Sequence, residues 1–288
     1  MMRLTRTTRK PRGATNLLLG SILAAMLLSA CGGQTSTPTS TPAGSDGGST
    51  ATPRATHVTN SQGSGSYGKL DATFGHAGRV TTEFGHSDQA RALVVQPDGK
   101  ILVGGEVWSY PEDTPSFGLA RYNEDGSLDE EFSKDGTEVT QMTQEYDYSR
   151  AYDLALQEDG KIVAVGSAID NDLGGSVFAL ARYKEDGTLD KTFGKAGKVL
   201  TNVVKVEDGP EESARAVAIQ PDGKIVVVGA TGEYVSDIAV LRYDSKGKLD
   251  ARFGHAGKVT TDIMEKDVAQ SVAIQPDGKI VVAGYAPN

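Results

Sequence analysis

A repeat of about 60 residues dominates this chain of 288 residues and decides what it can fold into. The segment LDATFGHAGRVTT at Leu70 returns in altered form at Leu128, Leu189 and Leu249, with spacings of 58, 61 and 60 residues. A second segment, QPDGKI followed by an apolar run and a glycine, begins at residues 96, 157, 220 and 275. A third, RY followed by a glycine turn and LD, occurs three times without a fourth copy. Repetition at this period indicates a tandem array of one structural unit.

Each unit contains four short apolar runs that are rich in β-branched residues and separated by turn residues. We name them a, b, c and d; in the third copy they are residues 198–203, 214–220, 224–228 and 238–243. The Asp-Gly pair between runs b and c predicts a tight hairpin. Run c is apolar on both faces, as expected of a strand that is covered on both sides. The sequence therefore predicts an all-β, β-propeller-like tandem array of about four four-stranded blades, the last lacking its fourth strand.

These motifs resemble the delta-60 repeat of bacteria, whose pattern joins FG..G.V, QPDGKI.V.G and RYN.DG.LD, over nearly all of residues 70–284. The resemblance implies a propeller-like array in an exported or surface protein, and it brings no established activity and no catalytic residues. For the strand missing after residue 284, one alternative is that segment 55–60 closes the last blade. The others are that the array is open, is completed by another chain or belongs to a longer one. An unpaired strand edge would favour self-association.

The N-terminus is typical of an export signal. Five basic residues precede the apolar run 17–28, which is too short to span a membrane. Cys31, the single cysteine, follows Leu-Ser-Ala as in a bacterial lipobox. This resemblance implies cleavage before Cys31 and a diacylglycerol anchor on its thiol, with an outer-membrane or surface location preferred. The predicted organisation is a signal peptide at 1–30, a lipidated and disordered Ser/Thr/Gly/Pro tether at 31–66, and a repeat domain at 67–288 with repeats starting near 70, 128, 189 and 249.

Charge and residue types exclude several kinds of site. A formal net charge of -9 and a pI near 5.0 argue against nucleic-acid binding. Residues 123–129 resemble a calcium loop, but the third copy has Lys246 in a ligand position and no glutamate lies at the EF-hand distance. We therefore predict no metal and no cofactor, with calcium as the alternative. The spacing of the histidines and the absence of GxSxG and Walker motifs give no catalytic or phosphate-binding signature.

Two charged positions recur eight residues apart in three copies. Either they form a ring of charges around a site or, as we expect of residues that recur in every unit, they are structural ion pairs. The pairs are Arg121 with Asp129, Arg182 with Asp190, and Arg242 with Asp250.

The variable loops are the predicted binding face. In an up-and-down blade the a–b and c–d loops lie at one end, and the near-identical b–c and d–a loops lie at the other. Function usually resides on variable loops held by a rigid scaffold. These loops are acidic and contain aromatic residues, which suits a surface protein, a cationic partner or a glycan. The other interpretation is a charged rim that keeps the domain soluble. The candidate residues are Trp108, Tyr110, Tyr146, Tyr148, Tyr234, Glu145, Asp147, Asp170 and Asp172.

An enzyme's functional residue is expected to be unique to one copy at an otherwise repeated position, and no such residue stands out. We therefore predict a non-enzymatic, surface-anchored lipoprotein that presents a binding or adhesion face. The alternatives are a propeller-type hydrolase or lactonase, with carboxylates or metal ligands converging on a central channel, and a truncated repeat protein without independent activity.

Overall fold

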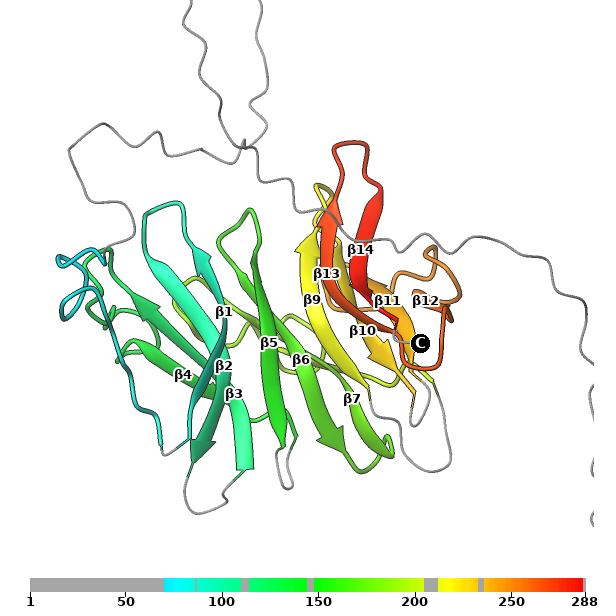
Figure 1. Ribbon diagram of the computed structural model, residues 1–288, viewed down its shortest axis with the longest axis horizontal. Coiled ribbons are helices and arrows are strands. Elements are labelled where there is room, and N and C mark those ends of the chain that lie inside the picture. Colours follow the sequence, from blue (N-terminus) through cyan, green and yellow to red (C-terminus); the bar gives the residue numbers. More distant parts are fainter. Residues whose placement is uncertain are drawn as a thin grey trace, which may run out of the picture. The chain divides into compact units, whose positions relative to one another are not determined.

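A computed structural model describes residues 70–85, 87–109, 114–143, 148–204, 212–232 and 236–286 (Figure 1). Within these ranges all regular secondary structure is β, as the repeat pattern predicts. No helix in the described ranges is long and apolar enough to cross a bilayer. The predicted signal peptide 1–30, the tether 31–66 with Cys31, and segment 55–60 lie outside the described residues.

Antiparallel sheets follow one another along the chain, and within each sheet the strand order is the chain order. The first sheet is β1 (Gln89–Val95), β2 (Ile101–Ser109), β3 (Thr114–Tyr122) and β4 (Thr137–Thr140). The second is β5 (Ser149–Leu156), β6 (Ile162–Asp170), β7 (Gly175–Tyr183) and β8 (Lys198–Thr201). The third is β9 (Ser213–Ile219), β10 (Ile225–Thr231), β11 (Asp237–Tyr243) and β12 (Lys258–Thr261). The last described sheet pairs β13 (Val268–Ile274) with β14 (Ile280–Tyr285). The predicted propeller-like array is confirmed.

The division of the repeats into sheets differs from the prediction by one strand. Each four-stranded sheet combines runs b, c and d of one copy with run a of the next, so that β8 pairs with β7. The d-to-a turn explains this pairing, because Arg182 N donates to Gly197 O at 2.9 Å and Asp190 N donates to Arg182 O at 2.8 Å. These bonds return run a beside the preceding d strand. The last described sheet therefore has two strands, and run a of the first copy, 79–82, forms no strand because no described d strand precedes it.

The hydrophobic core lies between neighbouring sheets. Leu102 and Phe117 of the first sheet are buried together with Leu154 and Ile162 of the second. Similar clusters join the second sheet to the third and the third to the last. β10 is buried along its whole length, which explains why run c is apolar on both faces. Each sheet is thus stabilised by burial against its neighbours, as in other tandem arrays.

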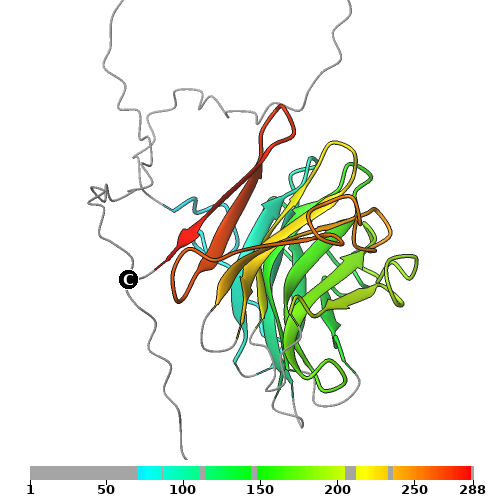
Figure 2. The same ribbon diagram turned by 90° about the vertical axis from the view of Figure 1, so that its right-hand side faces the viewer.

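The first strands of the four sheets, β1, β5, β9 and β13, pack side by side and are called the inner strands here (Figure 1). Figure 2 shows β13 and β14, in red, at one side of the stacked sheets. The pairing register shifts at the same point of every inner strand, which leaves one residue out of the ladder as a β-bulge. The bulged residues are Arg91, Tyr152, Arg215 and Gln270.

A repeated glycine makes room for each bulge. A Cβ atom on Gly229 of β10 would lie 1.9 Å from the carbonyl oxygen of Ser213 on β9, a distance that no side chain can tolerate. Gly105, Gly166 and Gly284 have the same close contact in their own sheets. These are the glycines that follow the apolar run of the QPDGKI motif, so their recurrence has a steric cause.

Candidate functional site

The variable loops lie at one end of the sheets. Hydrogen bonds join a–b loops to c–d loops there, because Asn202 Nδ2 donates to Leu173 O at 3.1 Å and Asp267 N donates to Ser236 O at 2.6 Å. The near-identical d–a turns contact one another at the opposite end. Ser133 N in one copy donates to Asp186 O of the next copy at 2.8 Å. The chain thus has one variable end and one uniform end.

The structure brings two of the predicted binding residues together. Trp108, at the end of β2, meets Tyr148 edge to face, with ring centroids 6.2 Å apart and an interplanar angle of 83°. The guanidinium of Arg150 lies 4.6 Å from the centre of the Tyr148 ring, and its Nη2 donates to the Tyr148 hydroxyl at 2.5 Å. Such packing holds the aromatic rings in one orientation at the variable end.

The remaining predicted residues divide into two groups. Asp170 and Asp172 lie at the β6–β7 turn, where Asp170 Oδ1 accepts a hydrogen bond from Leu173 N at 2.8 Å. The backbone is nearer, because Ile169 N, next to Asp170, donates to Tyr148 O at 3.1 Å. The others lie outside the described residues; they are Tyr110, Glu145, Tyr146, Asp147 and Tyr234.

A buried glutamate holds the arginine that packs on Tyr148. Glu106 on β2 is 2% exposed and forms ion pairs with Arg91 at 3.0 Å and with Arg150 at 2.5 Å. Two guanidinium groups offset the cost of burying one carboxylate. Corresponding positions on β6, β10 and β14 carry Ser167, Ala230 and Tyr285. Glu106 is therefore the one acidic residue at this position among the four copies, and its signal in the sequence is a charge directly after run c and the repeated glycine.

The four bulged residues line one hollow of about 430 Å³, which we call the inner pocket. The Tyr152 ring packs against a guanidinium group from each neighbouring inner strand. The Cζ atoms of Arg91 and Arg215 lie 5.2 and 4.4 Å from its centre. The hollow is therefore lined by at least one residue from each of the four sheets. Its lining residues are Arg91, Tyr152, Asp153, Arg215, Ala216, Gln270, Ser271 and Val272.

Asp153 is the carboxylate of the inner pocket. Its Oδ2 accepts a hydrogen bond from Val217 N on the next sheet at 2.8 Å, and its Oδ1 accepts one from Leu154 N at 2.9 Å. Burial raises the pKa of Asp153 above its ordinary value, although these two bonds oppose the change. Ala92, Ala216 and Ser271 occupy this position in the other copies. Like Glu106, Asp153 is therefore an acidic residue that this position carries in one copy.

The recurrent arginine and aspartate residues lie together within each turn. Distances between nitrogen and carboxylate oxygen are 2.6 Å for Arg121 and Asp129, 2.9 Å for Arg182 and Asp190, and 3.1 Å for Arg242 and Asp250. Each guanidinium also covers a phenylalanine of its own turn, at 4.7 Å for Phe132 and at 4.5 Å for both Phe193 and Phe253.

Two of these arginines also join neighbouring sheets. Arg121 Nη1 donates to Glu185 O at 2.6 Å, and Arg182 Nη1 donates to Ser245 O at 2.5 Å. In both cases the acceptor is a carbonyl in the glycine turn of the next copy. These two pairs therefore connect successive copies at the uniform end.

Oxygen-rich groups occur at two places. In the loop 123–129, Asp125 Oδ1 accepts hydrogen bonds from the Ser127 amide at 2.9 Å and from the Ser127 hydroxyl at 2.7 Å, so this carboxylate serves its own turn. The carboxylates of Asp237, Asp262 and Asp267 lie within 4.8 Å of one another, and their oxygens suit a divalent cation. Burial, followed by repulsion from Asp262 and Asp267, raises the pKa of Asp237.

Asp267 also has a structural role that two other copies share. Its Oδ2 accepts hydrogen bonds from Ile263 N and Met264 N of the preceding loop. Asp88 and Glu212, at the same position of their copies, accept backbone N–H groups of their own loops. In each of these three copies, an acidic side chain thus accepts the backbone N–H groups that hold the a–b loop in place.

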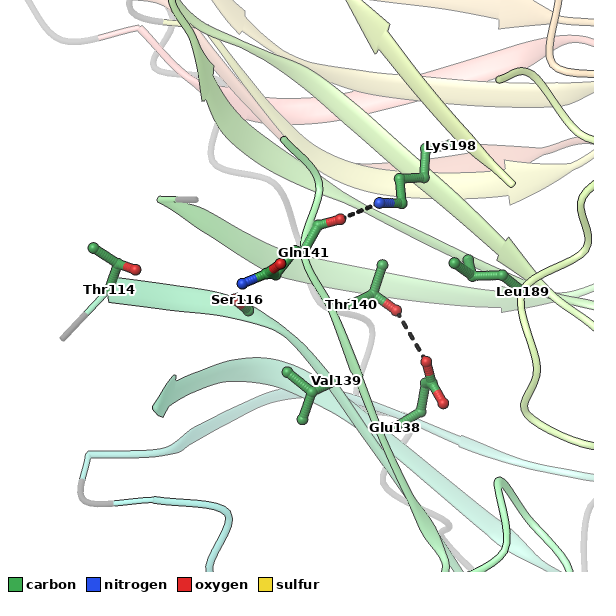
Figure 3. Close-up of a pocket in the computed structure, with 8 residues that line it drawn as sticks. All are labelled: Thr114, Ser116, Glu138, Val139, Thr140, Gln141, Leu189 and Lys198. Carbon is green, nitrogen blue, oxygen red and sulfur yellow. Dashed lines mark hydrogen bonds between the residues drawn. The ribbon is translucent and has the colours of Figure 1, made fainter. Parts of the chain in front are cut away.

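Another hollow, of about 370 Å³, lies between the outer strands of the first two sheets (Figure 3). Lys198 on β8 crosses it and donates to the carbonyl oxygen of Gln141. One copy further along, Lys258 makes the corresponding contact with Asn202 O at 2.6 Å. A lysine that bridges successive sheets in this way indicates a structural groove.

A comparison with protein families agrees with this architecture. Four segments, 96–132, 157–193, 220–253 and 275–286, match the family described as domain of unknown function (DUF5122) beta-propeller. The chain therefore contains β-propeller repeats. Among solved structures, it is similar to a crystal structure of an unknown function protein from Dyadobacter fermentans DSM 18053, with 14% sequence identity and a TM-score of 0.44. That similarity covers 68% of this chain and 56% of the other, so this chain spans little more than half of that protein's length. The curated proteins gave no match.

Proposed function

We propose that this protein is an exported, non-enzymatic binding protein that is lipid-anchored through Cys31 and uses the variable end of its propeller-like array to bind a surface glycan or protein. The resemblance to delta-60 repeats and to a lipobox supports the location. The Trp108–Tyr148 pair carries the binding proposal, because it is held by Arg150 and, through it, by the buried Glu106. Aromatic rings fixed in this way lose little entropy when a partner binds.

A glycan array tests the binding face with purified full-length protein. We expect the wild type to bind at least one glycan of the cell envelope, and Trp108→Ala and Tyr148→Ala to weaken that binding at least tenfold, as removal of an aromatic anchor typically does. Glu158→Ala is the matched control, because Glu158 is exposed in a turn of the uniform end. Unchanged binding by both aromatic variants would refute the proposed face.

Metabolic labelling with palmitate tests the anchor separately. The wild-type protein is expected to incorporate label and to enter the detergent phase on phase separation, whereas Cys31→Ser is expected to do neither. Equal labelling of the two proteins would show that Cys31 is not the acylated residue. Binding data and labelling data are independent, so either half of the proposal can fail alone.

The hydrolase or lactonase alternative requires carboxylates from several sheets at one centre. Among the described residues that line the inner pocket, Asp153 is the carboxylate, and both of its oxygens accept backbone hydrogen bonds. The nearby Glu106 is held by two arginines. This arrangement supports binding over hydrolysis.

A further inference from the structure

The inner pocket combines positive charge with hydrogen-bonding groups in an acidic protein. Arg91, Arg150 and Arg215 lie in or beside it, opposed by Glu106 and Asp153. The local balance is therefore positive, whereas the whole chain has a formal net charge of -9. A positive hollow in a negative surface attracts anions selectively.

Arg215 is the residue that a ligand would engage. Its Nε donates to Ser213 Oγ at 3.0 Å, and its guanidinium packs on the Tyr152 ring. Within the described part of the chain it has no carboxylate partner, and its Nη nitrogens donate no hydrogen bond. The ring therefore fixes a guanidinium whose outer edge is unused.

We propose that the inner pocket binds a small hydroxylated carboxylate of the sugar-acid class, with Arg215 as the bidentate partner of the carboxylate group. A planar guanidinium presents two parallel N–H groups at the spacing of a carboxylate. The Gln270 amide and the Ser271 hydroxyl, on the inner strand β13 next to that of Arg215, offer donors and acceptors for ligand hydroxyl groups. The volume of about 430 Å³ lies in the range of small-molecule sites.

The hydroxyl groups of the ligand distinguish it from other anions. Inorganic phosphate has no chain of hydroxyl groups to reach Gln270 and Ser271 while Arg215 holds its charge, so it makes fewer contacts in this hollow. Trp108 and Tyr148 do not line this hollow, although Arg150 and Glu106 connect it to them, and this inference does not depend on the proposed function.

Titration calorimetry of the full-length protein with D-glucuronate tests the inference, with D-glucose and inorganic phosphate as comparison probes. We expect saturable binding of glucuronate, no binding of glucose and at least tenfold weaker binding of phosphate. Arg215→Gln is expected to weaken glucuronate binding at least tenfold. Arg252→Gln, which removes an exposed arginine from a turn of the uniform end, is the control and should leave binding unchanged.

Two further variants separate the possible explanations. Gln270→Ala alters an exposed residue and is expected to weaken glucuronate binding severalfold without affecting folding. It therefore tests the pocket even if the Arg215→Gln variant misfolds. Trp108→Ala should retain glucuronate binding, whatever its effect on glycans. The inference is overturned if glucuronate gives no saturable heat up to about 10 mM, well above the millimolar constants of weak sites. It is also overturned if phosphate binds as tightly, or if Arg215→Gln and Gln270→Ala both bind normally.

Discussion

Replacing Arg182 with methionine should destabilise the protein far more than the same change at Arg242. Arg182 is 5% exposed, and its partner Asp190 is 3% exposed, so the variant leaves a carboxylate buried without its cation. Breaking a buried pair from one side costs about 3–5 kcal/mol. The variant also loses the hydrogen bond to Ser245 O that joins the second and third sheets.

The same pair in the third copy lies nearer the solvent. Side-chain exposure is 20% for Arg242 and 11% for Asp250, and within the described residues Arg242 has no bond to a following copy. Its loss should cost about 1 kcal/mol, as for ion pairs close to the surface. For a domain of this size we expect melting-temperature losses of about 10 °C for Arg182→Met and about 3 °C for Arg242→Met.

Thermal unfolding followed by circular dichroism measures both losses in purified full-length protein. The double variant Arg182→Met with Asp190→Asn should recover part of the loss, because no unpaired charge then remains buried. Equal losses in the two single variants, or a double variant that is less stable than Arg182→Met, would refute the reasoning.

Two further predictions concern the bulge and pH. Gly229→Ala should lower the free energy of unfolding by more than about 2 kcal/mol in chemical denaturation, because its Cβ would lie 1.9 Å from Ser213 O. Gly223→Ala should lower it by about 1 kcal/mol, because a Cβ there meets no atom within 4 Å and only the φ of +78° opposes it. Similar losses in the two variants would contradict the steric argument. Although burial opposes ionisation, hydrogen bonds from Thr192 and the charge of Arg182 lower the pKa of Asp190, so its folded-state pKa lies below the unfolded value of about 4. The ionised Asp190 therefore stabilises the fold above the unfolded pKa, and this contribution is lost as pH falls through the folded pKa. The difference in melting temperature between wild type and Asp190→Asn should accordingly shrink on acidification. A constant difference between pH 7 and about 3 would argue against this linkage.

The fold followed from the sequence because its signals are local and repeated. The Asp-Gly turns and the fully apolar run c predicted hairpins and strands that are covered on both sides. The placement of run a could not be derived in this way. Run a pairs with the preceding d strand because the turn between them is closed by hydrogen bonds such as Arg182 N to Gly197 O, and the apolar pattern does not reveal these bonds.

The candidate site was predicted less completely than the fold. The sequence alone identifies aromatic residues in the variable loops, and two of them, Trp108 and Tyr148, are in contact. The inner pocket was missed because its members lie far apart in the chain and share only a position within the b strand. A bulge shifts the alternation of inward and outward side chains, so Arg91 and Arg215 have no special place in a simple pattern of period two.

The bulge divides the residues of each inner strand into those paired in the ladder and one that is not. Residues within the ladder must fit a neighbouring sheet, and most changes there affect stability. The bulged residue belongs to no ladder pair, so its side chain can change while the strand keeps its hydrogen bonds. Arg91, Tyr152, Arg215 and Gln270 are accordingly held by contacts between their side chains, such as those of both arginines with Tyr152, and not by the ladder of the sheet.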